Sequence, residues 1–178
     1  KQFSVVNERS AMKVNTDGVL LGAAMTINSS DRVLLDIGTG TGTIALMAAQ
    51  RFLDFARNDT ADARNDNEDA RNLTVHAIDI DAISAEEAAM NFSNSPWSEH
   101  LQAHTASLDE YEASLEEGDT FDLIFSNPPY FDDSLGAPEQ RRNTARHTST
   151  GLLYREILDF AAVRLSDHGR VSMVLPSD

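Results

Sequence analysis

The chain has 178 residues, of which 14 are Lys or Arg and 29 are Asp or Glu, so its formal net charge is −15. Such an acidic chain is unsuited to loose, general binding of nucleic acid, because affinity for phosphate rests largely on Lys and Arg. It contains no cysteine, which excludes disulfides and thiolate metal sites. The length predicts one domain, residues 1–178, with a hydrophobic core.

The other compositional features give no sign of a metal, a membrane or export. The five histidines are scattered without the spacing of metal ligands, so we expect no metal. No apolar run approaches the roughly 20 residues that span a bilayer, and no signal peptide is visible at Lys1. We therefore expect a cytoplasmic protein without a membrane partner.

The first predicted helix begins at Val19, within the amino-terminal 30 residues. Thr16 or Asp17 can cap it, because hydroxyl and carboxylate oxygens accept the free N–H groups of a first helical turn. A strand is predicted next, over residues 33–37, from its apolar side chains.

A glycine-rich loop, Asp36–Gly42, follows this strand and precedes a helix predicted over 42–53. In such a unit the backbone N–H groups of the loop and of the helix amino terminus face a bound anion. The alternating glycines let the backbone approach a ligand and adopt positive φ. Thr43 stands where the Gly-x-Gly-x-x-Gly pattern of nicotinamide enzymes requires its third glycine, so that pattern is not met.

A second strand, predicted over 74–79, ends in Asp79, where nucleoside-binding folds place a carboxylate on the ribose hydroxyls. Asp79 lies farther beyond the glycine loop than the usual 20 residues or so. The polar stretch 54–72, with three similar Ala-Arg-Asn units, accounts for the excess, and we interpret it as an insertion. Asp81 is placed to cap a helix predicted over 82–92.

The most informative pattern is the tetrad Asn-Pro-Pro-Tyr at residues 127–130, directly after a strand predicted over 121–126. Two consecutive prolines donate no backbone hydrogen bond, so they fix a turn at the carboxyl end of the strand. Such a turn can hold a flat group that carries an amino group. The Asn127 side chain and the Ser126 or Pro128 carbonyl would accept its hydrogens, while Tyr130 would stack on its face. Taken alone, the prolines also suit a rigid exit from a strand.

The alternation of strands and helices predicts a doubly wound, mostly parallel α/β sheet of Rossmann-like type, with ligands at the carboxyl ends of the strands. The glycine loop and the tetrad both fall at that edge. The remaining elements are a strand at 101–105, a loop or short helix to about 118, a long loop to about 150, a helix over 151–165, a turn at Gly169 and a strand over 170–176.

In this order, the glycine loop, the acidic strand end and the tetrad resemble class I S-adenosylmethionine-dependent methyltransferases that act on adenine N6, cytosine N4 or glutamine N5. The chain further resembles the valine-tRNA adenine-N6 methyltransferase family from Phe3 to Pro176, with 54–72 as the interruption. The segments that carry this resemblance are 1–3, 12–22, 95–97 and 145–148. It implies methylation of the adenosine just 3′ of the anticodon in a valine tRNA.

The resemblance also implies site residues. Residues 1–30 would cover the cofactor and the substrate. S-adenosylmethionine would be bound by Asp36, Gly38, Thr39, Gly40, Gly42, Asp79, Ile80, Ser107 and Asn127. The catalytic tetrad would be Asn127, Pro128, Pro129 and Tyr130. Contacts to the anticodon loop of the tRNA would come from Lys13, Thr16, Asp17, Tyr130, Phe131, Arg141, Arg142, Arg146 and His147.

The cluster of arginines after the tetrad would form a local phosphate-binding patch on an acidic body, although a solvated loop with surface salt bridges has the same composition.

Three features depart from the family pattern. Ser107 stands where related enzymes often carry an acid near the cofactor adenine, and Asn15 stands where glycine usually precedes Thr16. The chain also ends at Asp178, after the fifth predicted strand, whereas the methyltransferase fold normally continues. We therefore expect a sheet that is truncated after its fifth strand and leaves an exposed edge.

Three other functions share parts of this pattern. A glutamine-N5 protein methyltransferase uses the same tetrad, but it resembles a catalytic domain preceded by a helical domain, for which there is no room before Asp36. A DNA adenine methyltransferase would need a target-recognition region, and none is seen. A non-catalytic S-adenosylmethionine-binding module would have no use for an amine clamp made by Asn127 and Tyr130.

Overall fold

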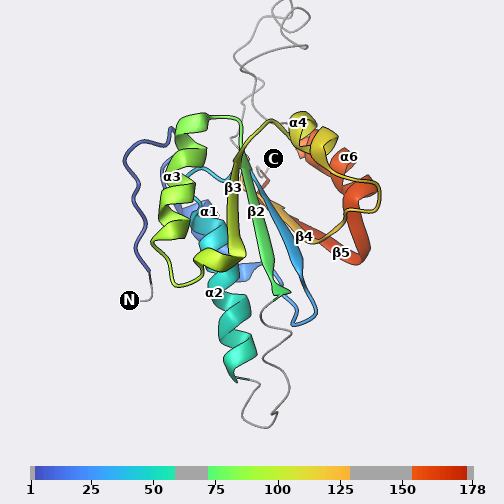
Figure 1. Ribbon diagram of the computed structural model, residues 1–178, viewed down its shortest axis with the longest axis horizontal. Coiled ribbons are helices and arrows are strands. Elements are labelled where there is room, and N and C mark those ends of the chain that lie inside the picture. The colour runs from blue at the N-terminus through green and yellow to red at the C-terminus, as the bar shows by residue number, and fades with distance from the viewer. Residues whose placement is uncertain (1–2, 59–71, 129–153, 176–178) are drawn as a thin grey trace, which may run out of the picture.

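The computed structural model describes residues 3–58, 72–128 and 154–175 (Figure 1). Within these residues a parallel sheet of five strands has the order β3–β2–β1–β4–β5. The strands are β1 (Val33–Ile37), β2 (Thr74–Asp79), β3 (Leu101–Thr105), β4 (Phe121–Ser126) and β5 (Leu165–Met173). The predicted doubly wound α/β architecture is therefore confirmed.

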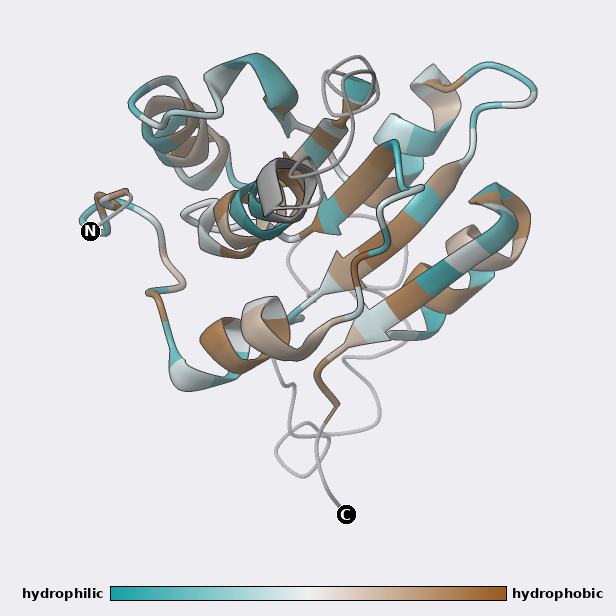
Figure 2. Cartoon of the chain, turned by 90° about the horizontal axis from the view of Figure 1, so that it is seen from below, coloured by the Kyte–Doolittle hydropathy of each residue, from teal (hydrophilic) through white to brown (hydrophobic). Residues whose placement is uncertain are grey.

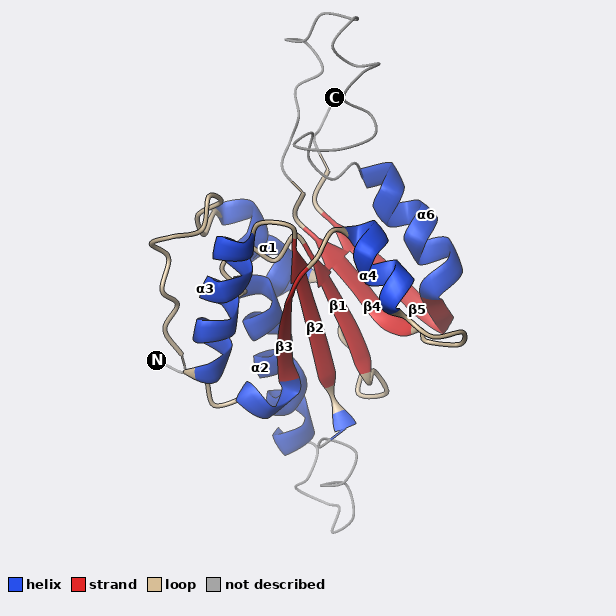
Figure 3. Cartoon of the chain, turned by 45° about the horizontal axis from the view of Figure 1, so that its top comes forward, coloured by secondary structure: helices blue, strands red, loops and turns tan. Residues whose placement is uncertain are grey.

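Helices cover both faces of the sheet (Figure 3). One face carries α1 (Thr16–Ala24), α2 (Thr43–Asn58) and α3 (Ala82–Ser93), and the other carries α4 (Leu108–Ser114) and α6 (Tyr154–Arg164). A short 3₁₀ helix, η3 (Ser98–His100), precedes β3. In the described part of the chain, no helix is long and apolar enough to cross a bilayer.

The central strands β1 and β4 are almost wholly buried because both faces of the sheet are covered there, and Figure 2 shows apolar residues along the inner strands. Leu34 of β1 packs into the core under α2 and α3, whereas its neighbour Leu35 packs into the core on the α4 and α6 face. This alternation follows from the two-residue period of a strand. It makes β1 the buried centre from which the glycine loop emerges.

The amino-terminal helix begins earlier than predicted. α1 starts at Thr16 rather than Val19, and its cap is Asn15 rather than Thr16 or Asp17. The Asn15 Oδ1 accepts the Gly18 N–H at 2.8 Å. The predicted cap of α3 is confirmed, since Asp81 Oδ2 accepts the Ser84 N–H at 3.1 Å.

Two other boundaries also differ. α2 continues to Asn58, so the first residues of the predicted 54–72 insertion are helical, and residues 59–71 lie outside the described residues.

β5 begins at Leu165, so Gly169 lies within a strand and not in a turn. A Cβ at Gly169 would lie 2.7 Å from the Phe121 carbonyl oxygen. The glycine is thus required by close approach to β4, near a register irregularity between β4 and β5.

Residues 3–15, which we call the strap, run without regular secondary structure along α3 (Figure 1). Their backbone N–H groups therefore need side-chain partners. Glu87 of α3 is fully buried and supplies them: its Oε1 accepts the N–H groups of Glu8 at 2.9 Å and Arg9 at 2.7 Å, and its Oε2 accepts that of Ser10 at 2.9 Å. One carboxylate thus holds three consecutive residues of the strap.

Two further buried side chains of α3 extend this contact. Asn91 exchanges two hydrogen bonds with the backbone of Val6 and also donates to the Thr41 carbonyl in the glycine loop at 2.9 Å. The Ser84 hydroxyl lies 2.9 Å from that of Ser10. Positions 84, 87 and 91 share one helix face, and they join the strap to the glycine loop.

We expect Glu87→Gln to lower the free energy of unfolding by about 1–3 kcal/mol, because the amide nitrogen would turn toward backbone donors. Burial acts to raise the pKa of Glu87, but the backbone donors and the charge of Lys13 outweigh it and hold the pKa below its usual value. Urea denaturation measures the change. The matched control is Glu86→Gln, whose exposed ion pair with Arg9 should contribute less than about 0.5 kcal/mol. Equal losses in the two variants would contradict this role of Glu87.

Candidate functional site

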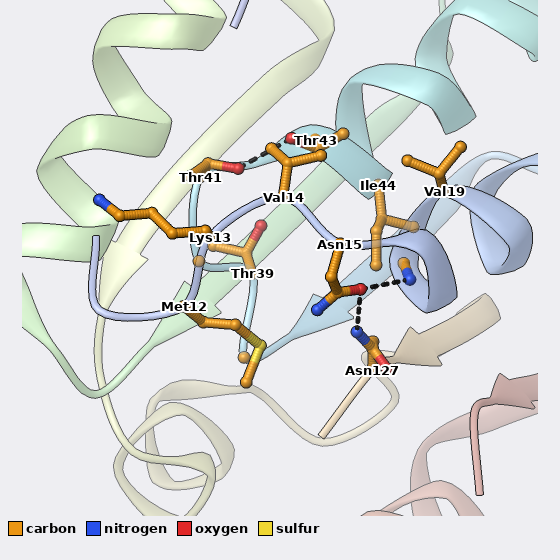
Figure 4. A pocket seen from close by; sticks show the side chains of 13 residues that line it. Met12, Lys13, Val14, Asn15, Val19, Thr39, Thr41, Thr43, Ile44 and Asn127 are labelled. Atoms are coloured by element: carbon orange, nitrogen blue, oxygen red, sulfur yellow. Dashed lines mark hydrogen bonds between the residues drawn. The ribbon is translucent and has the colours of Figure 1, made fainter. Parts of the chain in front are cut away.

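The glycine loop and Asn127 meet at the carboxyl edge of the sheet, as predicted. β1 and β4 are adjacent and parallel, with Asp36 opposite Phe125. The segments that leave these two strands therefore emerge side by side. Figure 4 shows the loop residues and Asn127 around one cavity, together with the end of the strap.

The loop adopts the conformation that its glycines permit. Gly38, Gly40 and Gly42 have φ values of +72°, +56° and +77°. A Cβ at Gly42 would lie 2.4 Å from the Phe92 ring, so this glycine is also required by close packing on α3. At Gly38 a Cβ would meet no described atom within 4 Å. The first glycine therefore leaves the loop open to an approaching ligand.

Asp79 fastens the loop to the end of β2. Its Oδ2 accepts the Gly40 N–H at 2.8 Å, and its Oδ1 accepts the Asp81 N–H at 2.9 Å. Burial is the main cause that raises the pKa of Asp79. The next residue, Ile80, is 70% exposed, which leaves a large apolar side chain beside the loop. Both predicted cofactor residues thus lie at the expected edge.

Asp36 is buried beneath the loop with an incomplete set of partners. Its Oδ2 accepts the Thr39 hydroxyl at 2.7 Å, whereas its buried Oδ1 has no hydrogen-bond partner among the described residues. Burial raises the pKa of Asp36 to about 7; the Thr39 hydrogen bond opposes this, the charge of Asp79 adds to it, and the Ala45 backbone N–H opposes it to the smallest extent. The site therefore favours a cationic or hydrogen-donating partner.

We expect Asp36→Asn to stabilise the ligand-free chain, and to do so more strongly as the pH rises. The pKa is about 7 in the folded chain against an ordinary value of 3.8, so folding becomes less favourable as the pH rises from about 4 to 7. Above about pH 7 the buried Asp36 carboxylate is charged in the folded wild-type chain, which lowers its stability. There Asp36→Asn should raise the free energy of unfolding by roughly 2–4 kcal/mol. Urea denaturation of both proteins between pH 4.5 and 8.5 measures this gain. A gain that does not change with pH would contradict the raised pKa.

Asn127 is buried, with 7% of its surface exposed, at the end of β4. Its Nδ2 donates to the Asn15 Oδ1 at 3.2 Å, and its Oδ1 is buried without a partner in the described part of the chain. The Ser126 carbonyl already accepts the Val174 N–H at 3.3 Å. Of the two backbone carbonyls considered from sequence, Pro128 is thus the better candidate to accept a second hydrogen from an amino group.

The strap closes over this edge. The cavity between the strap, α1, the loop and Asn127 measures about 40 Å³, room for a water molecule or two. Lys13 lines it and is exposed, and its Nζ donates to the Glu8 carbonyl at 2.7 Å. Thr16 and Asp17, predicted to contact the substrate, lie exposed in the first turn of α1 and do not line the cavity.

Sequence reasoning assigned no site role to three lining residues of this segment, Met12, Val14 and Val19. It expected the segment Asn15–Gly18 to line the base pocket, and Asn15 and Gly18 do line the cavity. The residue pattern around Met12, Val14 and Val19 does not indicate which strand end they cover.

Ser107 lies after β3, at the predicted edge, but its hydroxyl is engaged. It accepts the Glu110 N–H at 3.2 Å and donates to the Glu110 carboxylate at 2.9 Å. The Ser107 N–H donates to the same carboxylate at 2.9 Å, which completes a capping box for α4. A contact of this hydroxyl with a cofactor would compete with the cap. The other predicted residues lie outside the described residues: Pro129, Tyr130, Phe131, Arg141, Arg142, Arg146 and His147.

The hydrogen-bond acceptors of the site suit an organic ligand that carries amino groups. Asp36 Oδ1 and Asn127 Oδ1 are both buried acceptors without partners, beneath and beside a loop whose backbone a ligand can approach. Across the described ranges, no group of three or more His, Asp or Glu side chains is arranged to hold a metal ion.

Comparisons with known proteins agree with this geometry. Residues 23–178 match a family described as "RMKL-like, methyltransferase domain". The whole chain is 41% identical to a curated tRNA1(Val) (adenine(37)-N6)-methyltransferase of Bacteroides fragilis, of which it covers 66%. It is 36% identical to the protein of the same name from Haemophilus influenzae, of which it covers 67%. The chain thus spans about two thirds of the length of these relatives.

A solved structure supports the fold alone. The methyltransferase subunit of a type I restriction-modification system from Streptococcus thermophilus matches with a TM-score of 0.57. The match covers 96% of this chain and 36% of that chain, at 15% sequence identity.

Proposed function

Because this chain belongs to the family of the tRNA1(Val) (adenine(37)-N6)-methyltransferases, we propose that it methylates the exocyclic N6 of an adenine in tRNA, next to the anticodon of a valine tRNA. The methyl donor is S-adenosylmethionine. The observation that carries the proposal is the buried Asn127 Oδ1, which has no partner in the described structure and lies beside the glycine loop. A free acceptor at this place is what an amino group requires.

The residues of the loop edge fit the cofactor, which when bound supplies an electrophilic methyl group. The free oxygen and raised pKa of Asp36 suit an ammonium group, whose charge would favour the carboxylate. Gly38 allows the backbone to approach a carboxylate. The remaining cofactor contacts that we propose are Thr39, Gly40, Gly42, Asp79, Ile80 and Ser107.

Asn127 would activate the target amine by orienting it. The N6 lone pair of adenine is delocalised into the ring, so the amine is a poor nucleophile. Hydrogen bonds from its two protons to the Asn127 Oδ1 and the Pro128 carbonyl favour a tetrahedral nitrogen whose lone pair points outward. Holding the reactants in line supplies up to roughly 7–11 kcal/mol. No general base is needed before transfer, because the proton becomes acidic only afterwards.

The substrate contacts outside the described residues belong to the same proposal. Tyr130 and Phe131, after Pro129, would stack the adenine once it leaves the anticodon loop. Lys13 and the residues Arg141, Arg142, Arg146 and His147 would bind phosphates. Thr16 and Asp17, which are exposed in the first turn of α1, would contact the tRNA outside the cavity. With a tRNA as substrate, we propose that the protein acts in the cytoplasm.

The test is methyl transfer from labelled S-adenosylmethionine to bulk tRNA that lacks the modification, followed by mass spectrometry of the nucleosides. We expect N6-methyladenosine in one valine tRNA. A transcript of that tRNA with guanosine 3′ of the anticodon is the control and should accept no methyl group. Absence of N6-methyladenosine, with cofactor binding shown by calorimetry, would indicate a glutamine substrate or a binding module instead.

A further inference from the structure

We infer that Asn15 is a positioning residue, which fixes the side-chain amide of Asn127 so that its oxygen and not its nitrogen faces the target amine. This inference rests on the proposed function, because the amine is the group that the amide oxygen would hold. Asn15 itself would touch neither reactant and would act through Asn127.

Two hydrogen bonds, from Gly18 to Asn15 and from Asn127 to Asn15, determine the direction of the Asn127 amide (Figure 4). The Gly18 N–H donates to the Asn15 Oδ1 at 2.8 Å. A backbone N–H can only donate, so Asn15 must present its oxygen at this point. The same oxygen accepts the Asn127 Nδ2 at 3.2 Å. The NH₂ end of Asn127 is therefore turned toward α1, and its oxygen is turned away from Asn15.

The opposite orientation of Asn127 would be unfavourable at both ends. The oxygen and the nitrogen of an amide have nearly the same size, so only their hydrogen-bond partners distinguish the two orientations. If the amide were reversed, two oxygens would face each other at Asn15. The NH₂ group would then face the target amine, donor against donor, and the amine would lose its acceptor.

The contact between the two asparagines lies close against Gly18, although Asn15 itself is exposed. A Cβ at Gly18 would lie 3.3 Å from the Asn15 Oδ1 and 3.5 Å from the Asn127 Nδ2, so the absence of a side chain at Gly18 leaves the contact its room. Asn15 is the last residue of the strap, and Glu87 holds the strap on α3. The orientation of Asn127 thus depends on contacts that extend to α3.

The test separates this role from the helix cap that Asn15 also provides. Ser and Asp both cap helices well, so neither Asn15→Ser nor Asn15→Asp should change stability appreciably. Only the aspartate reaches Asn127 with an acceptor. We expect Asn15→Ser to lower kcat for tRNA methylation by about 3- to 10-fold, because one hydrogen bond favours one orientation of the Asn127 amide over the other by about this factor. The KM for tRNA should stay within about twofold of wild type. Asn15→Asp should keep kcat within about threefold of wild type.

Asn94→Ser is the matched control for this substitution. Asn94 is an exposed asparagine after α3 whose side chain donates to the Met90 carbonyl, and its replacement should leave kcat unchanged. A kcat for Asn15→Ser equal to that of this control would overturn the inference.

A second measurement is independent of activity. In NMR spectra of the ligand-free protein, the side-chain NH₂ signals of Asn127 are identified by their loss in Asn127→Ala. We expect their exchange with solvent to become faster in Asn15→Ser and to stay slow in Asn15→Asp. Unchanged exchange in Asn15→Ser would refute the contact. If the wild-type protein methylates no tRNA, the proposed function fails, and the exchange of these protons still decides whether Asn15 holds Asn127.

Discussion

Replacing Asn127 with alanine is expected to slow methyl transfer to tRNA at least about 100-fold while the chain stays folded. Removal of one preorganised hydrogen-bonding group from an active site typically costs about 10²–10³ in rate. Asn127 is the only group in the described structure that brings a free, buried side-chain oxygen to the cavity. Alanine offers neither that oxygen nor the NH₂ group that pairs with Asn15. Single-turnover methylation with saturating cofactor measures the effect.

Two controls make this result interpretable. Asn94→Ala removes an exposed asparagine side chain from the end of α3 and should leave the rate unchanged. Calorimetry with S-adenosylmethionine should show that Asn127→Ala retains cofactor binding within about tenfold, so that the loss can be assigned to the transfer step. Undiminished turnover by Asn127→Ala would show that the amine is held by another group.

The second large effect concerns the glycine loop. We expect Gly42→Ala to lower the free energy of unfolding by roughly 2–5 kcal/mol. The residue has a φ of +77°, which costs an L-residue about 1–2 kcal/mol. Its new Cβ would also lie 2.4 Å and 2.9 Å from two atoms of the buried Phe92 ring, and such overpacking costs about 1–3 kcal/mol more. Urea denaturation measures the sum.

Gly38→Ala is the matched control, because it separates backbone strain from the clash. Gly38 has nearly the same φ, +72°, but a Cβ there would meet no described atom within 4 Å. Its replacement should cost only the backbone strain, about 1–2 kcal/mol. If both variants lost the same stability, the contact of Gly42 with Phe92 would not be the reason for the glycine.

The sheet and its ligand edge could be predicted because their signals are local. β1 and β4 read as apolar runs of the right length, and the glycine loop and the tetrad each follow one of them directly. In a parallel sheet this alone brings Asp36 and Asn127 to one edge. The positions of Asp79 and Ile80 follow from the same argument.

The parts that sequence did not predict depend on distant contacts. Nothing in the residues around Gly169 shows that the Phe121 carbonyl lies against it, so the start of β5 was placed too late. The cap by Asn15 was missed because Thr16 and Asp17 are equally good capping residues in isolation. The cap that Ser107 forms on α4 was not predicted, although Glu110 stands three positions later, where a capping box places its acid.

The contact between Asn15 and Asn127 joins residues 112 positions apart. The strap, α1 and the glycine loop leave the ribosome long before β4, yet β4 lies directly beside β1 in the finished sheet. Pairing of such distant segments carries a greater entropic cost than local pairing and comes late in folding. A growing chain therefore carries the acceptor at Asn15, with no Asn127 amide for it to orient, until the fourth strand has been made and inserted. No fragment that stops before β4 can form the site.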